Sequence, residues 1–260
     1  MSRCGPGASA HSRQFFSDMQ NEPGAMAPTL PGGEPLTALI DFGTGPMPVR
    51  RAFGRARAIL VASTLDDVVP VLDAVHRHAL QGRWCVGYVR YEAAPAFDAA
   101  MVVHAGQGPL AWFSVYDEAH PWPDMGDSEA HDAPAPLEWH SRLDRPQFDR
   151  AISRIHAAIE RGDVYQVNYT AGIHAPRQAS DASAQRQNSL RLFAALCQAQ
   201  PRAYAAWLDT GTQQVASVSP ELFFHWQDGC ILTRPMKGTA ARGATPAADA
   251  AAAEALRASA

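Results

Sequence analysis

The chain of 260 residues has almost no lysine: Lys237 is the only one among 22 basic residues. It also lacks any apolar run of the roughly 18 residues that a transmembrane helix needs. The N-terminal residues have no apolar core of the signal-peptide type. A formal net charge of −4 gives no electrostatic reason to bind nucleic acid or an anionic membrane surface. We therefore expect a cytoplasmic protein with neither kind of partner.

Cysteine is also scarce, and the four cysteines are far apart: Cys4, Cys85, Cys197 and Cys230. Structural zinc sites and disulfide frameworks need closer or more regular spacing than this. The ten histidines show no metal-binding spacing either. We expect no metal site within the chain itself.

What the chain does have is enough apolar material for a real core, with 47% hydrophobic and 18% charged residues. Residues 1–35, rich in Gly, Ser and Pro, are expected to form a disordered leader. Residues 36–117 are expected to form an N-terminal subdomain. A Pro- and Ala-rich linker is expected at 118–140, followed by the first part of a catalytic domain at 141–260.

Hydrophobic periodicity predicts a mixture of helices and strands. Apolar residues at helical spacing predict a helix over 65–79, with Thr64 as N-cap and Gly82 after its end. Residues 84–91 and 110–116 are rich in aromatic and β-branched side chains, which is typical of strands.

The second half continues this mixture. Pro146 marks the first turn of a helix that ends before Gly162. Alternating apolar and polar residues predict a strand at 163–170. A helix is expected at about 186–200, and a further strand at about 204–208.

Residues 222–227 and 230–234 are predicted to form a β-hairpin, because Asp-Gly at 228–229 is a strong two-residue turn signal. A regular ladder around that turn would place Phe223 opposite Arg234 and Glu221 opposite Met236, next to Lys237. Pro220 and Pro235 make the pairing irregular at that end, since proline donates no ladder hydrogen bond. The prediction therefore concerns a shared neighbourhood.

Two interpretations of Lys237 are open on residues alone. It can be a leftover surface lysine that forms an exposed ion pair, a contact that contributes about 0–1 kcal/mol and needs no function. It can also be a nucleophile, because an ammonium can lose its proton whereas arginine cannot. Gly238 follows it directly and would allow a ligand to approach the backbone, so a small-anion site is a second hypothesis.

Three segments resemble, in order and spacing, the chorismate-utilising enzymes. They are GDVYQVN at 162–168, SPELF at 219–223 and TRPMKGT at 233–239. The resemblance extends over about 148–242. This family includes anthranilate synthase, aminodeoxychorismate synthase, and the isochorismate and salicylate synthases. The segment YEAAPAF at 91–97 further resembles the short type of aminodeoxychorismate synthase large component.

Two positions distinguish the branches of that family. The isochorismate and salicylate branch has a water-activating lysine where this chain has Gln166, which favours ammonia as the nucleophile. Anthranilate synthases usually have a small residue where this chain has Lys237. The aminodeoxychorismate branch has a lysine there, which acts as a covalent nucleophile. The resemblance therefore favours the large component of aminodeoxychorismate synthase, also called para-aminobenzoate synthase component I.

The resemblance implies a mechanism in which chorismate binds with its ring carboxylate on Mg²⁺. Lys237 would attack C2 while Glu221 protonates the departing C4 hydroxyl, and ammonia would then add at C4 and displace the lysine. For this the pKa of Lys237 must fall from about 10.4, which desolvation would achieve. A protonated Glu221 would avoid the opposing effect of a carboxylate and suits a general acid.

The resemblance also implies the remaining site residues and partners. Gly238, Thr239, Gln166 and Ser219 would contact the substrate. Ammonia would come from a glutamine amidotransferase subunit in the folate pathway. The acidic metal ligands of the family would lie beyond Ala260. The implied fold is α/β (α+β), like that of anthranilate synthase, with two antiparallel sheets flanked by helices and truncated at the C-terminus.

Residues 247–260 form an Ala-rich helical pattern without a C-cap, which suggests a fragment cut within a helix. Two alternatives to the assignment as aminodeoxychorismate synthase stay open. The chain can belong to an anthranilate synthase large component, or it can be an inactive truncated remnant that acts as an interaction module.

Overall fold

The computed structural model describes residues 29–30, 32–43, 48–123, 137–176, 181–236 and 238–258. The strands are β1 (Ala38–Phe42), β2 (Val49–Phe53), β3 (Ala58–Ala62), β4 (Trp84–Val89), β5 (Ala111–Tyr116), β6 (His140–Ser141), β7 (Ile173–His174), β8 (Tyr204–Asp209), β9 (Gln214–Ser219), β10 (Leu222–Gln227) and β11 (Cys230–Arg234). The helices are α1 (Leu65–Leu80), α2 (Arg145–Glu160), α3 (Ala182–Ala199) and α4 (Pro246–Ala258), with a 3₁₀ helix, η3, at Tyr91–Ala96.

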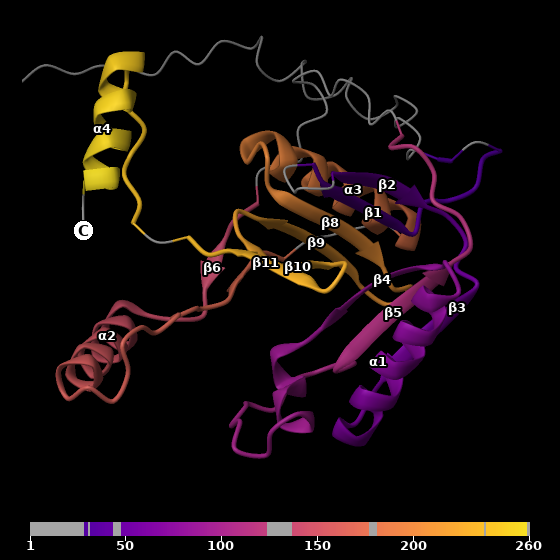
Figure 1. The fold of residues 1–260 in the computed structure, drawn as a ribbon, viewed down its shortest axis with the longest axis horizontal. Helices are drawn as coiled ribbons and strands as arrows, with labels where there is room; N and C mark the ends of the chain where they lie inside the picture. Colours follow the sequence, from indigo (N-terminus) through magenta and orange to yellow (C-terminus); the bar gives the residue numbers. More distant parts are fainter. Residues whose placement is uncertain are drawn as a thin grey trace, which may run out of the picture.

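A four-stranded antiparallel sheet in the order β2-β1-β8-β9 forms the centre of the molecule (Figure 1). Its middle pair joins β1 to β8, with Leu39 opposite Trp207. Both side chains are fully buried. The sheet therefore contains strands from both sides of the stretch 118–140, while the expected division into subdomains stays a prediction.

A second antiparallel sheet has the order β3-β5-β4, and α1 packs against all three of its strands. The predicted helix is confirmed, including its N-cap: the Asp67 carboxylate accepts a hydrogen bond from the Thr64 backbone N–H at 2.8 Å. This bond, together with hydrogen bonds from the Thr64 hydroxyl and the Ser63 N–H, holds the pKa of Asp67 below its usual value. The strands predicted at 84–91 and 110–116 are confirmed as β4 and β5, and every boundary lies within two residues of its prediction.

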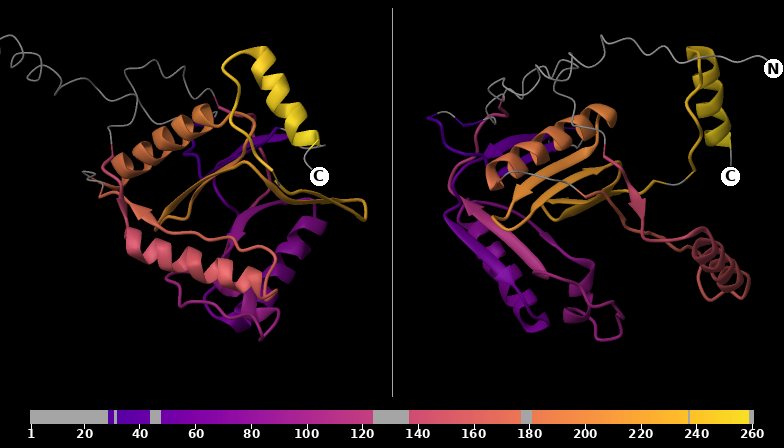
Figure 2. Two further views of the ribbon diagram at one scale, coloured as in Figure 1. Left: turned by 90° about the vertical axis from the view of Figure 1, so that its left-hand side faces the viewer. Right: turned by 180° about the vertical axis from the view of Figure 1, so that it is seen from behind.

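The core lies where the two sheets meet and beneath α3. One cluster of buried side chains comes from the four-stranded sheet and from α3, which covers it (Figure 2). Its largest members are Trp207 and Phe193. A second cluster, with Phe53 and Tyr116, connects the two sheets. Leu30 is 3% exposed and belongs to the first cluster, so the described end of the expected leader packs on the folded body.

Residues 1–28 of that leader lie outside the described residues. So do 124–136, the middle of the expected linker.

The predicted hairpin β10–β11 is confirmed with its strand boundaries unchanged. Asp228 and Gly229 both have positive φ angles, 51° and 75°, as a type I′ turn requires. The predicted register is wrong at the open end. Leu222, and not Phe223, lies opposite Arg234, because the ladder shifts between Leu222 and His225. One extra residue on β10 forms a bulge there.

The predicted strand at 163–170 is wrong. That stretch lies between α2 and β7 without a strand assignment. Its alternating pattern has the period of a strand, but a strand also needs a hydrogen-bonded partner. Tyr165 is 96% exposed, and Tyr169 contacts Phe148 of α2, with ring centroids 6.1 Å apart, instead of a neighbouring strand. The helix expected from Pro146 is confirmed as α2, with Asp144 as N-cap.

The α2 arm, residues 142–172, extends from the body and is closed at its base by the short β6–β7 ladder (Figure 1). No residue of α2 is buried. The third expected helix is confirmed as α3 but begins earlier, at Ala182, because Asp181 accepts a cap hydrogen bond from the Ala184 N–H. The Ala-rich helix is confirmed as α4, also without a buried residue.

The fold class is confirmed as α+β, with antiparallel sheets and flanking helices. Among the described residues, no helix combines the length and apolar character needed to cross a membrane.

We expect Phe193→Ala to lower the free energy of unfolding by about 3–5 kcal/mol, because it removes a fully buried ring from beneath the central sheet. Urea denaturation followed by tryptophan fluorescence measures this difference. The matched control is Phe223→Ala, since the Phe223 side chain is 85% exposed. Its effect should stay within about 0.5 kcal/mol. Equal losses in the two variants would contradict the described core.

Candidate functional site

Two of the three sequence motifs meet at the open end of the β10–β11 hairpin. The Glu221 carboxylate accepts a hydrogen bond through Oε1 from the Met236 backbone N–H at 3.1 Å. The predicted neighbourhood of Glu221 and Met236 is therefore confirmed, although the register that predicted it was wrong. The bulge on β10 leaves Glu221 one residue before the ladder, where its side chain spans the gap to the other strand.

A turn at Ser219 fixes the backbone of Glu221. The Ser219 hydroxyl donates to the Glu221 carbonyl oxygen at 3.0 Å and accepts from the Glu221 N–H at 3.3 Å. Because β9 ends at Ser219, this turn connects the central sheet directly to the carboxylate. Glu221 is thus held through its backbone by Ser219 and through its carboxylate by the Met236 N–H. Lys237, the next residue in sequence, lies outside the described residues.

The segment after the third motif folds back toward it. A Cβ added at Gly238 would lie 3.3 Å from Cδ2 of Leu256, the main apolar residue of α4. A Cβ at Gly243 would overlap the backbone of Asp249, so only glycine fits where α4 begins. Leu256 therefore packs beside Gly238, one of the predicted substrate contacts.

A bidentate ion pair holds the segment between Gly238 and α4 in this folded-back conformation. Arg242 donates through Nε and Nη2 to the two carboxylate oxygens of Asp249, at 2.6 Å each. The Gly243 N–H donates to the same carboxylate at 3.0 Å. The Arg242 guanidinium and then the Gly243 amide hold the pKa of Asp249 below its usual range.

The other predicted site residues are less closely associated. Thr239 is exposed next to Gly238. Gln166 is exposed in the stretch after α2, where its amide donates to the Asn168 side chain at 3.3 Å. Within the described ranges, no hydrogen bond connects Gln166 to the hairpin. The structure thus brings together Ser219, Glu221 and the vicinity of Gly238, and does not join Gln166 to them.

Two hollows lie away from these motifs. The larger, of about 410 Å³, lies where β5 ends and is lined by Glu34, Gly54, Arg55, Ala56, Arg57, Tyr116, Asp117, Glu118 and His120. Its volume falls within the range of small-molecule pockets. Two of its charged residues neutralise each other, because Asp117 pairs with Arg57 at 3.0 Å, and Asp117 also pairs with Arg83 at 3.2 Å. None of the predicted site residues lines it.

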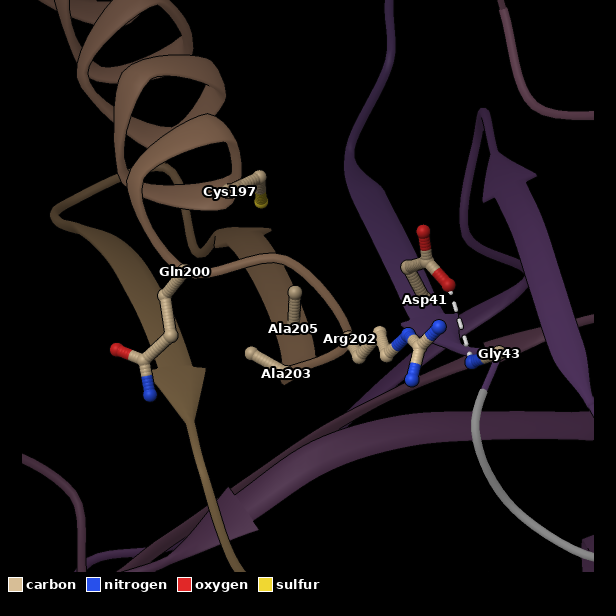
Figure 3. A pocket seen from close by; sticks show the side chains of 7 residues that line it. All are labelled: Asp41, Gly43, Cys197, Gln200, Arg202, Ala203 and Ala205. Carbon is tan, nitrogen blue, oxygen red and sulfur yellow. Dashed lines mark hydrogen bonds between the residues drawn. The ribbon is translucent and has the colours of Figure 1, made fainter. Parts of the chain in front are cut away.

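The smaller hollow, about 70 Å³, lies between the ends of β1 and α3 (Figure 3). Arg202 extends from the turn after α3 toward Asp41 (Figure 3). The Asp41 carboxylate accepts from the Gly43 N–H and pairs with Arg50 at 3.1 Å. The cavity holds only about two water molecules' share of volume, too little for a ring-sized substrate. Sequence reasoning missed it, and an acidic residue within an otherwise apolar strand was the single available signal.

The ranges that the structure describes contain no group of three or more His, Cys, Asp or Glu side chains able to hold a metal ion. They therefore supply no ligand set for Mg²⁺.

Comparison with known proteins gives the family. A model of the chorismate binding enzymes matches residues 42–260, which is most of the chain. The chain belongs to this family. The match includes all three motifs and the hairpin on which two of them meet.

Relatives within the chorismate binding enzymes come from two branches. Aminodeoxychorismate synthase component 1 of Klebsiella aerogenes is 30% identical over 160 residues, which cover 59% of this chain and 33% of that protein. The Bacillus subtilis protein of that name is 33% identical over 98 residues, 38% of this chain and 19% of that protein. Anthranilate synthase component 1 1 of Haloarcula marismortui is 31% identical over 128 residues, 48% and 24% of the two chains. The chain thus spans a third or less of these curated relatives.

We expect Glu221→Ala to speed amide hydrogen exchange at Met236 several-fold, because the Met236 N–H loses its only described acceptor. Exchange followed by NMR measures this rate. Glu221→Gln keeps an acceptor oxygen at the same position and is the matched control, so its Met236 amide should exchange nearly as slowly as in the unmodified chain. Identical rates in all three proteins would refute the hydrogen bond.

We expect Arg242→Gln to raise the pKa of Asp249 toward its ordinary value, because the guanidinium is the main cause of its depression. A carboxyl with a depressed folded-state pKa stabilises the fold above its unfolded pKa of about 3.9, and this contribution is lost as the pH falls through the folded value. Carbon-detected NMR titration measures the pKa of Asp249 in the unmodified chain and in the variant. Arg257→Gln, near the other end of α4, is the control and should leave Asp249 unchanged. A similar change in both variants would point to general loss of the helix.

Proposed function

We propose that this chain carries the nucleophilic part of an aminodeoxychorismate synthase, in which Lys237 attacks chorismate. The observation that carries the proposal is the hydrogen bond between Glu221 and the Met236 N–H. It brings a carboxyl group beside the residue that precedes the only lysine of the chain. A nucleophilic amine and a general acid must lie close together in this reaction, since both act on one six-membered ring.

The first chemical step forms a bond between Nζ of Lys237 and C2 of the chorismate ring. Both conjugated ring double bonds shift, from C1=C2 and C5=C6 to C1=C6 and C4=C5, and the C4–O bond breaks, while Glu221 gives its proton to the departing hydroxyl, which leaves as water. Ammonia then forms a bond to C4 as both double bonds shift back to C1=C2 and C5=C6 and the C2–N bond breaks. The product is 4-amino-4-deoxychorismate, and Lys237 is released as a free amine.

The hydrogen bond to Met236 is compatible with the acid role of Glu221. A protonated carboxyl group has one oxygen that accepts and one that carries the proton. Because Oε1 accepts from Met236, Oε2 is the oxygen from which the proposed acid step would donate its proton. The Ser219 turn holds the Glu221 backbone, so this orientation needs no rearrangement when substrate binds.

Two features support ammonia as the second nucleophile. Gln166 has an amide, which cannot act as a base toward water, at the position where the resemblance expects a lysine in water-using relatives. Relatives whose names include component 1 further imply a second component. We propose that this partner is a glutamine amidotransferase that supplies ammonia.

Anthranilate synthase is the second candidate function. It is favoured by relatives with that name, in Haloarcula marismortui and in Pseudomonas putida, each 31% identical over the aligned residues. In that reaction ammonia would add directly to C2 of chorismate, without a covalent lysine. The two functions therefore differ in whether Lys237 becomes modified.

The test is to incubate the protein, expressed from its full open reading frame, with chorismate, Mg²⁺ and ammonium. Products are separated by chromatography, and the digested protein is examined by mass spectrometry. We expect aminodeoxychorismate as product and, when ammonium is omitted, an adduct of chorismate minus water on Lys237. The adduct is identified by the peptide that contains Lys237, and residues 1–260 contain no other lysine.

Variants at two positions separate the roles. Lys237→Arg keeps the positive charge but cannot provide a free amine, so adduct and product should both fall by at least about a hundredfold. Glu221→Gln keeps the acceptor for Met236 and loses the proton, and a loss of about 10²–10⁴ is expected for a general acid. An unchanged rate in Lys237→Arg would refute the nucleophilic role, and anthranilate as product would favour the second candidate.

A further inference from the structure

Two histidines face each other at the base of the α2 arm. In the antiparallel β6–β7 ladder, His140 lies directly opposite His174, and Ser141 lies opposite Ile173. The two imidazole rings have their centroids 5.6 Å apart, with an angle of 40° between their planes. Neither sequence motif nor family resemblance singled out this pair, because 33 positions separate the two residues in the sequence.

The ring separation suits the chelation of one metal ion. A metal–imidazole nitrogen bond is about 2.0–2.1 Å long, which places each ring centre about 3.2 Å from the ion. Two ring centres at that distance are 5.6 Å apart when the angle at the ion is about 120°, close to that of a tetrahedral site. The present separation of the two rings is therefore the one that two imidazoles bound to a shared ion would have.

The surroundings also favour a cation. A carboxylate oxygen of Glu138 lies 3.9 Å from Nε2 of His140. The His140 side chain is 46% exposed, which leaves room for water molecules to complete the coordination. The Glu138 charge compensates part of the charge of a divalent ion and can orient one of those waters.

We propose that His140 and His174 form a two-histidine site for a borderline divalent metal ion of the Zn²⁺, Ni²⁺ or Cu²⁺ class. Imidazole is a preferred ligand for these ions, whereas Mg²⁺ and Ca²⁺ prefer oxygen. The pair lies on the β6-β7 sheet, whereas Glu221 lies beside the separate β10-β11 sheet. The metal site does not depend on the proposed function.

Bound metal would act on the placement of the arm. The ladder has only two residue pairs, and one of them is the histidine pair. The Arg142 N–H also donates to the Gly172 carbonyl oxygen at 3.1 Å. A metal bridge between the strands would close this base more firmly, and with it the segment that contains Gln166.

Titration calorimetry with Ni²⁺ alone tests the site. The untagged chain is used after its thiols have been blocked with iodoacetamide, so that cysteine cannot bind the metal. We expect one Ni²⁺ per chain at micromolar concentration, and binding weaker by at least about tenfold in both His140→Gln and His174→Gln, because each loses the second arm of the chelate. His225→Gln, on exposed β10, is the matched control and should bind as the unmodified chain does.

Pulsed electron paramagnetic resonance with Cu²⁺ provides a measurement that needs no variant to fold. Two coordinated imidazoles per ion are expected in the unmodified chain and one in either single variant. Circular dichroism verifies that the variants remain folded. The proposal is overturned if the unmodified chain shows a single imidazole, if it binds no Ni²⁺ at millimolar concentration, or if His140→Gln and His174→Gln bind as tightly as the control.

Discussion

The pairing of β1 with β8 is the constraint on which the rest of the structure depends. It joins Ala38 to Leu208 and Leu39 to Trp207, across about two thirds of the chain. Trp207 is fully buried, its indole N–H donates to Ser189 at 2.9 Å, and Arg186 lies over its ring at 5.7 Å. The same residue thus connects the sheet to α3. Without this pairing, α3 and the N-terminal strands would have no common surface to cover.

The position of the candidate site follows from that sheet. β8 pairs with β9 along its whole length, and β9 ends at Ser219, whose hydroxyl fixes the turn into Glu221. Glu221 is therefore connected through β9 to the buried strand β8, although its carboxylate is itself exposed. This arrangement is typical of functional side chains, which lie at the ends of strands where a rigid scaffold gives way to accessible surface.

Local signals in the sequence were sufficient for much of the fold. The Asp228-Gly229 turn predicted both strands of the hairpin, and Thr64 as N-cap and Pro146 in a first helical turn predicted the starts of two helices. Predictions that needed a partner strand were less secure. The pattern at 163–170 has the period of a strand but no partner, and the hairpin register failed where a bulge inserts one residue. Neither feature is encoded locally.

In the candidate site, too, local features could be predicted from the sequence and features that depend on distant segments could not. The closeness of Glu221 and Met236 could be predicted, because the turn between their strands is short. The hollow at Asp41 could not be predicted, since its walls come from β1 and from the turn after α3, which are joined only by the fold. The histidine pair depends likewise on a ladder of two residues, too short to leave a pattern.

The outer surface of the β10–β11 hairpin has a consequence for handling the protein. Phe223, Phe224, Trp226 and Ile231 are each more than half exposed, on a two-stranded sheet that pairs with no other strand in the described chain. Such a surface offers both apolar contact and free backbone edges to other molecules. A net charge of −4 over 260 residues opposes such contacts only weakly. Concentration and ionic strength will therefore decide how long the purified chain remains dispersed.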